Sequence, residues 1–284
     1  MSAIKSVGVV GAGSMGQGIA QSSATAGYDV LLCDVKPEIL EKGIQNITRN
    51  LDQAVVKGKL TEEKKKETLV RIRTISPENL KADLIIEAVI EKLELKQKIF
   101  ADLEMINGTQ TIFATNTSSL SVTKIAAGLN HPQRFLGLHF FNPAHLMKLV
   151  EVISGEKTDE KLIPAMAGFV KSLEKIPVIV KDSPGFIVNR VARHYYLESL
   201  KLLEEKGADI GTIDALTRSA GFKLGPFELM DLIGNDINLE VSRQMYEAFG
   251  QAKRFKPSSI QEEKVRSGNL GKKTGKGYYD YEKN

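Results

Sequence analysis

One histidine and one glutamate in this sequence are placed where they could move a proton to or from a substrate. His139 ends the mostly apolar run 135–138, and Glu151 comes twelve residues later, within a second short apolar run. A chain reversal through Asn142-Pro143-Ala144 would set the two runs side by side as strands. A carboxylate beside an imidazole fixes its tautomer and stabilises the imidazolium. His139 is therefore a candidate acid or base near neutral pH.

The same pattern also fits a core histidine that is held by a structural carboxylate, because structural ion pairs are common. The surroundings of the pair must decide between the two interpretations. The remaining histidines favour structural or solvated positions: His131 precedes a proline in a turn, His145 follows the candidate strand in a loop, and His194 lies inside a predicted helix.

A glycine-rich turn near the start of the chain provides such surroundings. The apolar run 7–10 breaks into Gly-Ala-Gly-Ser-Met-Gly, and small residues at helical spacing follow. Gly11 would make the tight turn, Gly13 would let the backbone approach a pyrophosphate, and Gly16 would let the helix pack on the strand. The pyrophosphate would lie on free N–H groups at the positive end of the helix. We expect these residues to bind a dinucleotide: Gly11, Ala12, Gly13, Ser14, Met15 and Gly16.

An aspartate at the end of the next apolar run indicates which dinucleotide. Asp34 follows residues 30–33 and lies 23 residues after Gly11. At this separation a carboxylate can accept hydrogen bonds from both ribose hydroxyls of NAD, and its charge disfavours the 2′-phosphate of NADP. The alternative is a plain strand-turn-helix with an unrelated surface aspartate. The strand and helix signals on both sides favour NAD as the cofactor.

The patterns around these residues predict an α/β fold with a doubly wound, Rossmann-type, mostly parallel sheet. Strand-like and helical patterns alternate through the first two-thirds of the chain, and a helical arm is inserted at about residues 38–70. The expected strands cover residues 7–10, 30–34, 70–75, 84–89, 111–115, 135–141, 149–153 and 178–180, and the other expected helices cover 93–106 and 160–173.

The composition changes after Ser183-Pro184-Gly185, and the rest of the chain is predicted to be helical. The expected helices cover residues 188–205, 210–219, 226–233, 238–249 and 259–267. We therefore expect an NAD-binding domain over residues 1–184 and a smaller all-α domain over residues 185–284.

Several predicted strands are followed by polar side chains at their carboxyl ends, where open α/β sheets bind their ligands. Glu91 and then Lys96 follow the fourth strand, and residues 116–119, Asn-Thr-Ser-Ser, follow the fifth. The sixth strand ends in His139 and the Asn-Pro pair at residues 142–143. This convergence favours a catalytic His139 over a structural one.

The composition sets limits on the other functional classes. A length of 284 residues has room for roughly two domains. The net charge of +4 falls short of a nucleic-acid footprint. No apolar run approaches the roughly 18 residues of a membrane span, and no secretory leader precedes the first strand. The single cysteine, Cys33, lies in a predicted buried strand. We expect a cytoplasmic protein that binds neither nucleic acid nor membrane.

Longer segments carry a resemblance that covers essentially the whole chain: GAGSMG, LLCD, ATNTSS, GLHFFNPAHLMKLVEVI, DSPGFIVNR and KTGKGYYDY. In these segments the sequence resembles the L-3-hydroxyacyl-CoA dehydrogenase family, and within it the bacterial 3-hydroxybutyryl-CoA dehydrogenases. The resemblance implies NAD-dependent interconversion of (S)-3-hydroxybutyryl-CoA and acetoacetyl-CoA, with no metal, and a homodimer formed through the C-terminal domain. The sequence by itself leaves a monomer open.

The resemblance also implies roles for single residues. It makes His139 the catalytic histidine and Glu151 its partner, and it places Ser118 and Asn189 at the C3 oxygen of the substrate. Around the nicotinamide half of NAD it implies Glu91, Lys96, Ser118 and Asn142, with Lys273 from the tail. It places Asn50 and Lys57 of the helical arm against coenzyme A.

Other interpretations remain open from the sequence. The same scaffold could serve a dehydrogenase of a sugar acid or of another hydroxy acid without coenzyme A, or a nucleotide-sensing protein without catalysis. In the arm, the lysines at positions 57, 59 and 64–66 are interleaved with glutamates, which is typical of a solvated helix face. Lys57 differs, because it directly follows the apolar face and could reach a phosphate.

Overall fold

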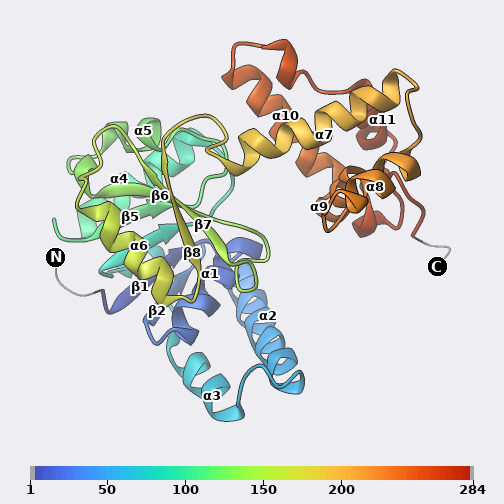
Figure 1. The fold of residues 1–284 in the computed structure, drawn as a ribbon. Coiled ribbons are helices and arrows are strands. Elements are labelled where there is room, and N and C mark those ends of the chain that lie inside the picture. Colours follow the sequence, from blue (N-terminus) through green and yellow to red (C-terminus); the bar gives the residue numbers. More distant parts are fainter. Residues whose placement is uncertain (1–3, 282–284) are drawn as a thin grey trace. The chain divides into compact units, whose positions relative to one another are not determined.

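The computed structural model describes residues 4–281, and the chain divides between Ser183 and Pro184 into two compact units (Figure 1). The first unit combines a sheet with helices, and the second is helical. Each unit has its own cluster of buried apolar side chains. The predicted fold class, a Rossmann-type sheet followed by a smaller all-α part, is confirmed.

The first unit is built around one sheet. Its strands are β1 (Ser6–Val10), β2 (Asp29–Cys33), β3 (Ile72–Thr74), β4 (Leu84–Glu87), β5 (Ile112–Thr115), β6 (Phe135–Phe140), β7 (Leu149–Ser154) and β8 (Ile176–Lys181). Within the described residues they follow the order β3-β2-β1-β4-β5-β6-β7-β8. The strands from β3 to β6 in this order are parallel, β7 is antiparallel to β6, and β8 is parallel to β7.

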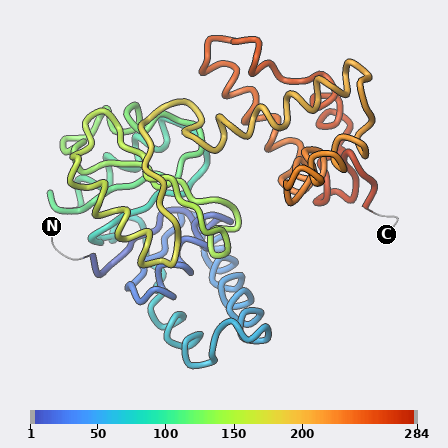
Figure 2. Tube along the Cα trace, viewed as in Figure 1, coloured from blue at the N-terminus to red at the C-terminus, as the bar shows by residue number. Residues whose placement is uncertain are grey.

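Helices cover the sheet and form the predicted arm. They are α1 (Ser14–Thr25), α2 (Pro37–Val56), α3 (Glu62–Val70), α4 (Leu93–Ile106), α5 (Val122–Ile125) and α6 (Leu162–Ser172). The arm consists of α2 and α3, which pack against each other and against α1 (Figure 2). Thr61 caps α3, because its hydroxyl accepts a hydrogen bond from the Lys64 amide. Gly58 makes the turn between the two helices with a positive φ of 65°.

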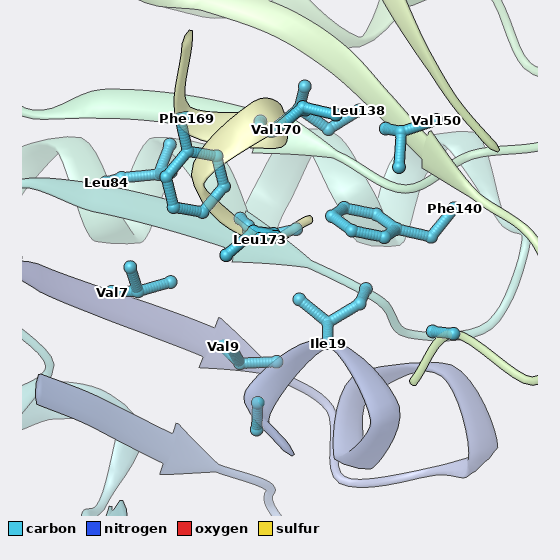
Figure 3. Close-up of a cluster of buried hydrophobic side chains, with 14 of the residues drawn as sticks. Val7, Val9, Ile19, Leu84, Leu138, Phe140, Val150, Phe169, Val170 and Leu173 are labelled. Carbon is cyan, nitrogen blue, oxygen red and sulfur yellow. The ribbon is translucent and has the colours of Figure 1, made fainter. Parts of the chain in front are cut away.

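The core of the first unit fixes the glycine turn and the sixth strand relative to each other. Val9 of β1, Ile19 of α1 and Phe140 of β6 are all buried, and they lie in one cluster with Phe169 of α6 (Figure 3). Removing a large apolar side chain from such a core costs about 2–5 kcal/mol. The residues after β1 and those at the end of β6 are therefore held by the same rigid packing.

The second unit is a set of packed helices. They are α7 (Val188–Glu204), α8 (Ile210–Ser219), α9 (Pro226–Ile233), α10 (Asn235–Ala248) and α11 (Ser259–Arg266). The C-terminal segment is tied to α9 by Asp231, which is almost completely buried. Its carboxylate accepts hydrogen bonds from the amides of Tyr278 and Tyr279 and from the hydroxyl of Tyr281.

A few predicted boundaries are wrong. The strand expected at residues 70–75 is only Ile72–Thr74, because α3 continues to Val70. The helix expected at 238–249 begins at Asn235, because Gly234 takes a φ of 105° that ends α9 and lets α10 start at once. The short helix α5 was not predicted. Among residues 4–281, no helix combines the length and the apolar character needed to cross a membrane.

Candidate active site

His139 and Glu151 lie opposite each other on the antiparallel strands β6 and β7. The Nδ1 atom of His139 is 2.6 Å from Oε2 of Glu151. Both side chains are buried, with His139 5% exposed and Glu151 fully covered. The apolar runs on both strands thus bury a charged group together with its hydrogen-bond partner, as a buried carboxylate requires.

The hydrogen bond fixes the chemistry of the imidazole. An ionised carboxylate only accepts hydrogen bonds, so Nδ1 carries the hydrogen and Nε2 carries the lone pair of the neutral ring. The adjacent negative charge stabilises the imidazolium that forms when Nε2 takes up a proton. The ring also packs against Phe141, with ring centroids 4.5 Å apart. This arrangement suits a general base that returns its proton as a general acid.

Two polar contacts fix the chain at the end of β6. The side-chain oxygen of Asn116, just after β5, accepts a hydrogen bond from the Phe140 amide at 2.8 Å. Beyond the strand, the Ser14 hydroxyl is 3.3 Å from Oδ1 of Asn142. The first contact ties the strand that carries His139 to its neighbour, and the second joins its following loop to the glycine turn. Asn116 was expected at this edge of the sheet but not as a positioning residue.

The glycine turn fits a dinucleotide. Gly11 has a φ of 96°, and a Cβ on Gly16 would overlap the carbonyl oxygen of Gly11. A Cβ on Gly13 would meet no atom within 4 Å, and no side chain caps α1 at this residue. The backbone is therefore open to a ligand where the N–H groups of the first helical turn point outward. Oδ2 of Asp34 accepts a hydrogen bond from the Ala12 amide at 2.9 Å, which sets the carboxylate beside the turn.

Glu91 organises the loop that follows β5. Its Oε1 atom accepts hydrogen bonds from the Thr117 hydroxyl at 2.6 Å and from the Ser118 amide at 2.8 Å. Oε2 lies 3.2 Å from the ammonium of Lys96. Burial alone would raise the pKa of Glu91, but the charge of Lys96 and these hydrogen bonds outweigh burial and lower the pKa below its ordinary value. The carboxylate thereby holds Ser118 in place.

Lys96 has a second carboxylate partner that the sequence analysis missed. The Lys96 side chain is 1% exposed, and its Nζ lies 2.5 Å from Oε1 of Glu87, the last residue of β4. Oε2 of Glu87 accepts a hydrogen bond from the Thr115 hydroxyl at 2.7 Å. The sequence did carry a signal for this partner, because Glu87 is an acidic residue at the end of an apolar strand. The network places the Lys96 ammonium between two carboxylates, one of which, Glu91, holds the loop of Ser118.

A cavity of about 530 Å³ lies between the arm, α1 and the loop that joins β6 to β7. Asn50 and Lys57, the two residues expected to contact coenzyme A, both line it. Its other charged or titratable lining residues are Lys59, Lys64, His145, Lys148, Glu174 and Lys175. Lys59 and Lys64, which were expected on a solvated face, line this cavity while remaining accessible to solvent: Lys59 is exposed, and the Lys64 side chain is 42% exposed.

Two of the expected site residues belong to the second unit. Asn189 lies in the first turn of α7, and Lys273 lies in a short 3₁₀ helix near the C-terminus. The Lys273 ammonium pairs with both carboxylate oxygens of Asp236, at 2.6 and 2.7 Å. The remaining expected residues, from the glycine turn to Glu151, lie in the first unit.

Family models match almost the whole chain. Residues 6–183 match the model described as "3-hydroxyacyl-CoA dehydrogenase, NAD binding domain". Residues 185–281 match the model described as "3-hydroxyacyl-CoA dehydrogenase, C-terminal domain".

Curated proteins and solved structures are similar over the same length. The chain is 47% identical to a 3-hydroxyadipyl-CoA dehydrogenase of Escherichia coli K12 over 281 residues, which cover 98% of this chain but 59% of that protein. It is 41% identical to a 3-hydroxybutyryl-CoA dehydrogenase of Bradyrhizobium diazoefficiens, with 98% of this chain and 96% of that one covered. The crystal structure of (S)-3-hydroxybutyryl-CoA dehydrogenase from Ralstonia eutropha superposes with a TM-score of 0.93, at 40% identity, covering 98% of this chain and 99% of that one.

Proposed function

The chain belongs to the 3-hydroxyacyl-CoA dehydrogenase family, with the family's NAD-binding domain at residues 6–183, and on this premise we propose that it interconverts (S)-3-hydroxybutyryl-CoA and acetoacetyl-CoA. The observation that carries the proposal is the buried pair of His139 and Glu151, 2.6 Å apart at the carboxyl end of β6. Its supports are the glycine turn at the same edge of the sheet and the names of the relatives.

In the oxidative direction, neutral His139 takes the proton of the C3 hydroxyl at Nε2. Glu151 keeps the ring in the required tautomer and stabilises the charge that the ring gains. In the reductive direction His139 starts as the imidazolium and returns the proton to the C3 oxygen. NAD, when bound, accepts or supplies the hydride at C3.

Ser118 and Asn189 hydrogen-bond the C3 oxygen in this proposal. Hydrogen-bond donors at that atom orient the substrate and stabilise the polarised carbonyl. Ser118 suits the role because Glu91 holds its backbone amide at 2.8 Å. The Ser118 hydroxyl, which donates to the same carboxylate at 3.3 Å, turns to the substrate oxygen in this proposal. Asn189, from the second unit, supplies the other contact.

In this proposal, two groups of residues bind the two ends of the cofactor. The turn from Gly11 to Gly16 holds the pyrophosphate, and Asp34 accepts hydrogen bonds from the adenosine ribose. Glu91, Ser118 and Asn142 lie around the nicotinamide half, with Lys273. Lys96, which was expected there too, is 1% exposed and acts through its ion pair with Glu91 instead. The charge of Asp34 makes NAD the preferred cofactor over NADP.

The cavity beside the arm takes coenzyme A in this proposal. Asn50 and Lys57 contact it, and the lining lysines outnumber the single lining carboxylate, Glu174. Such a wall attracts the phosphates of a thioester of coenzyme A, whereas a small free hydroxy acid has no need of it.

The test is NADH consumption with acetoacetyl-CoA, free acetoacetate and 3-oxoadipyl-CoA, each repeated with NADPH. We expect kcat/KM to be highest for acetoacetyl-CoA with NADH. Equal rates with free acetoacetate would contradict the coenzyme A assignment. Faster turnover of 3-oxoadipyl-CoA would instead assign the chain 3-hydroxyadipyl-CoA, the substrate in the name of the Escherichia coli relative. A preference for NADPH would contradict the role of Asp34.

A further inference from the structure

Lys175 is a buried lysine that the proposed chemistry does not use. It immediately precedes β8, and the residue is only 6% exposed. Its Nζ donates hydrogen bonds to the carbonyl oxygens of Ala144 at 2.6 Å and of Met147 at 2.8 Å. Both carbonyls belong to residues 141–148, the β6–β7 loop. This loop connects the strand that carries His139 with the strand that carries Glu151.

The ammonium has an unfavourable electrostatic environment. Within the described part of the chain, no carboxylate forms an ion pair with it. The charge that affects its pKa is that of Lys148, a second cation. Burial, and then the charge of Lys148, lower the pKa of Lys175 to about 8. A charged group kept in a costly position, facing a cavity, is a candidate for a functional role.

The two hydrogen bonds hold a loop that is packed tightly on α1. A Cβ on Gly18 would lie 3.0 Å from the Cβ of Ala144, so the loop sits directly on the helix backbone. The Ser22 hydroxyl also donates to the Ala144 carbonyl, at 3.4 Å. His145 and Leu146, between the two clamped carbonyls, line the 530 Å³ cavity together with Lys175. A shift of this loop would therefore change the wall of the cavity.

We propose that Lys175 is a positioning residue that clamps the β6–β7 loop in the form that binds acyl-CoA. The proposal rests on the proposed function of the cavity as the coenzyme A site. Lys175 acts through the loop: its two hydrogen bonds set the cavity wall at His145 and Leu146, and its charge adds to the positive field of the cavity.

The proposal predicts a pH dependence of acyl-CoA binding. Several groups face Lys175 across or around the cavity: Lys148 and His145 from the loop, Lys57, Lys59 and Lys64 from the arm, and Glu174 beside it. The pKa of His145 is lowered by burial and by the charge of Lys175. An anionic ligand favours the protonated form of Lys175, so affinity is highest below the pKa of about 8 and falls as the pH rises through it.

The experiment measures KM for acetoacetyl-CoA and for NADH across the pH range that spans this pKa, in the wild type and two variants. We expect the wild-type KM for acetoacetyl-CoA to rise about fivefold at alkaline pH, since charge-assisted hydrogen bonds are about twice as strong as neutral ones. In Lys175→Met this KM is raised at every pH and the alkaline rise is lost. The KM for NADH changes much less in both, because Asn142 is the residue of this loop that is assigned to the cofactor and it has its own contact with Ser14.

Lys148→Met is the charge control, because it removes one positive charge from the same cavity and keeps both Lys175 hydrogen bonds, at the loss of one hydrogen bond from the end of the loop to the Glu174 carbonyl. Removing Lys148 also removes a charge that lowers the Lys175 pKa, so the alkaline rise in KM should move to higher pH. A wild-type KM that stays flat through the Lys175 pKa would overturn the proposal without any variant. So would a Lys175→Met enzyme with the wild-type profile.

Hydrogen exchange of residues 141–148, with and without coenzyme A, tests the clamp independently of turnover. We expect faster exchange in Lys175→Met than in the wild type or Lys148→Met, and protection by coenzyme A in the wild type. Unchanged exchange in Lys175→Met would overturn the clamp even in an active enzyme. Faster exchange in a chain that does not turn over acetoacetyl-CoA would support the clamp and contradict the proposed function instead.

Discussion

The imidazole of His139 owes its proposed role to its neighbours on two strands. A histidine in a buried strand could be inert, but Glu151 lies directly across from it and binds Nδ1 at 2.6 Å. With Glu151 ionised, that contact places the hydrogen on Nδ1 and the lone pair on Nε2. Nε2 is therefore the atom that can act as the base, and Glu151 stabilises the positive charge that the ring gains.

Replacing Glu151 with glutamine should lower turnover without removing the cofactor site. The amide keeps the size of the side chain but loses the charge that stabilises the imidazolium, so we expect kcat to fall roughly 10–10²-fold. The measurement is kcat for acetoacetyl-CoA together with the Kd for NADH. Glu156→Gln, at an exposed position just beyond β7, is the control. Wild-type turnover in Glu151→Gln would exclude the carboxylate from the proton transfer.

The sequence was sufficient to predict this pair but not the contacts behind it. His139 and Glu151 lie on neighbouring strands of one hairpin, so an apolar pattern and a turn signal were enough to bring them together. Lys175 was missed because its partners lie elsewhere in the chain: Ala144 is 31 residues away. Glu87 is only nine residues from Lys96, but it ends an apolar strand and was counted with the core. No local pattern shows that a lysine is buried against two carbonyl groups.

Secondary-structure elements were predicted well where the periodicity was uninterrupted. Helix α4, residues Leu93–Ile106, has the predicted bounds. The start of α10 was missed because Gly234 ends one helix and begins the next, which a search for apolar spacing does not detect. The carboxyl ends of β4 and β5 meet as a parallel sheet requires, and Glu91 therefore reaches the loop of Ser118.

Glu91 should stabilise the loop after β5, and with it the folded protein, to an extent that depends on pH. The pKa of Glu91 is lower in the folded protein than its ordinary value of 4.5. Its stabilisation is therefore fully present above pH 4.5 and is lost as the pH falls through the lower folded pKa. We expect Glu91→Gln to lower the free energy of unfolding by about 1–3 kcal/mol at neutral pH, because several donors lose a charged acceptor.

Urea unfolding of Glu91→Gln and the wild type at neutral and acidic pH measures this difference. The gap between the two proteins should shrink as the pH falls below the ordinary glutamate range. Asp102→Asn, at an exposed position in the second half of α4, should show no such gap. A gap that is independent of pH would mean that the hydrogen bonds of Glu91 do not depend on its charge.

The chain as a whole combines two units, and both contribute residues to the proposed function. The first carries the His139–Glu151 pair, the glycine turn and the cavity, and the second carries Asn189 and Lys273. Large apolar side chains are exposed on the second unit: Leu216, Phe222, Leu232 and Ile237 are each at least half exposed. On the strength of these side chains and of the family likeness, we propose that two copies of the chain associate through this unit.

Sedimentation equilibrium of the purified chain tests this association. We expect a mass twice the 31.2 kDa of one chain. The dimer should persist at high salt, because burial of apolar surface does not depend on screened charges. A single-chain mass over the whole concentration range would rule the dimer out.

The turnover number of His139→Gln is the most direct test of the proposed chemistry. With acetoacetyl-CoA and NADH, we expect kcat to fall roughly 10²–10⁴-fold, the usual loss when a general acid–base group is removed, while the Kd for NADH stays unchanged. His131→Gln, in a turn before β6, should keep full turnover. Near-wild-type turnover in His139→Gln, with NADH still bound, would show that another group carries the proton.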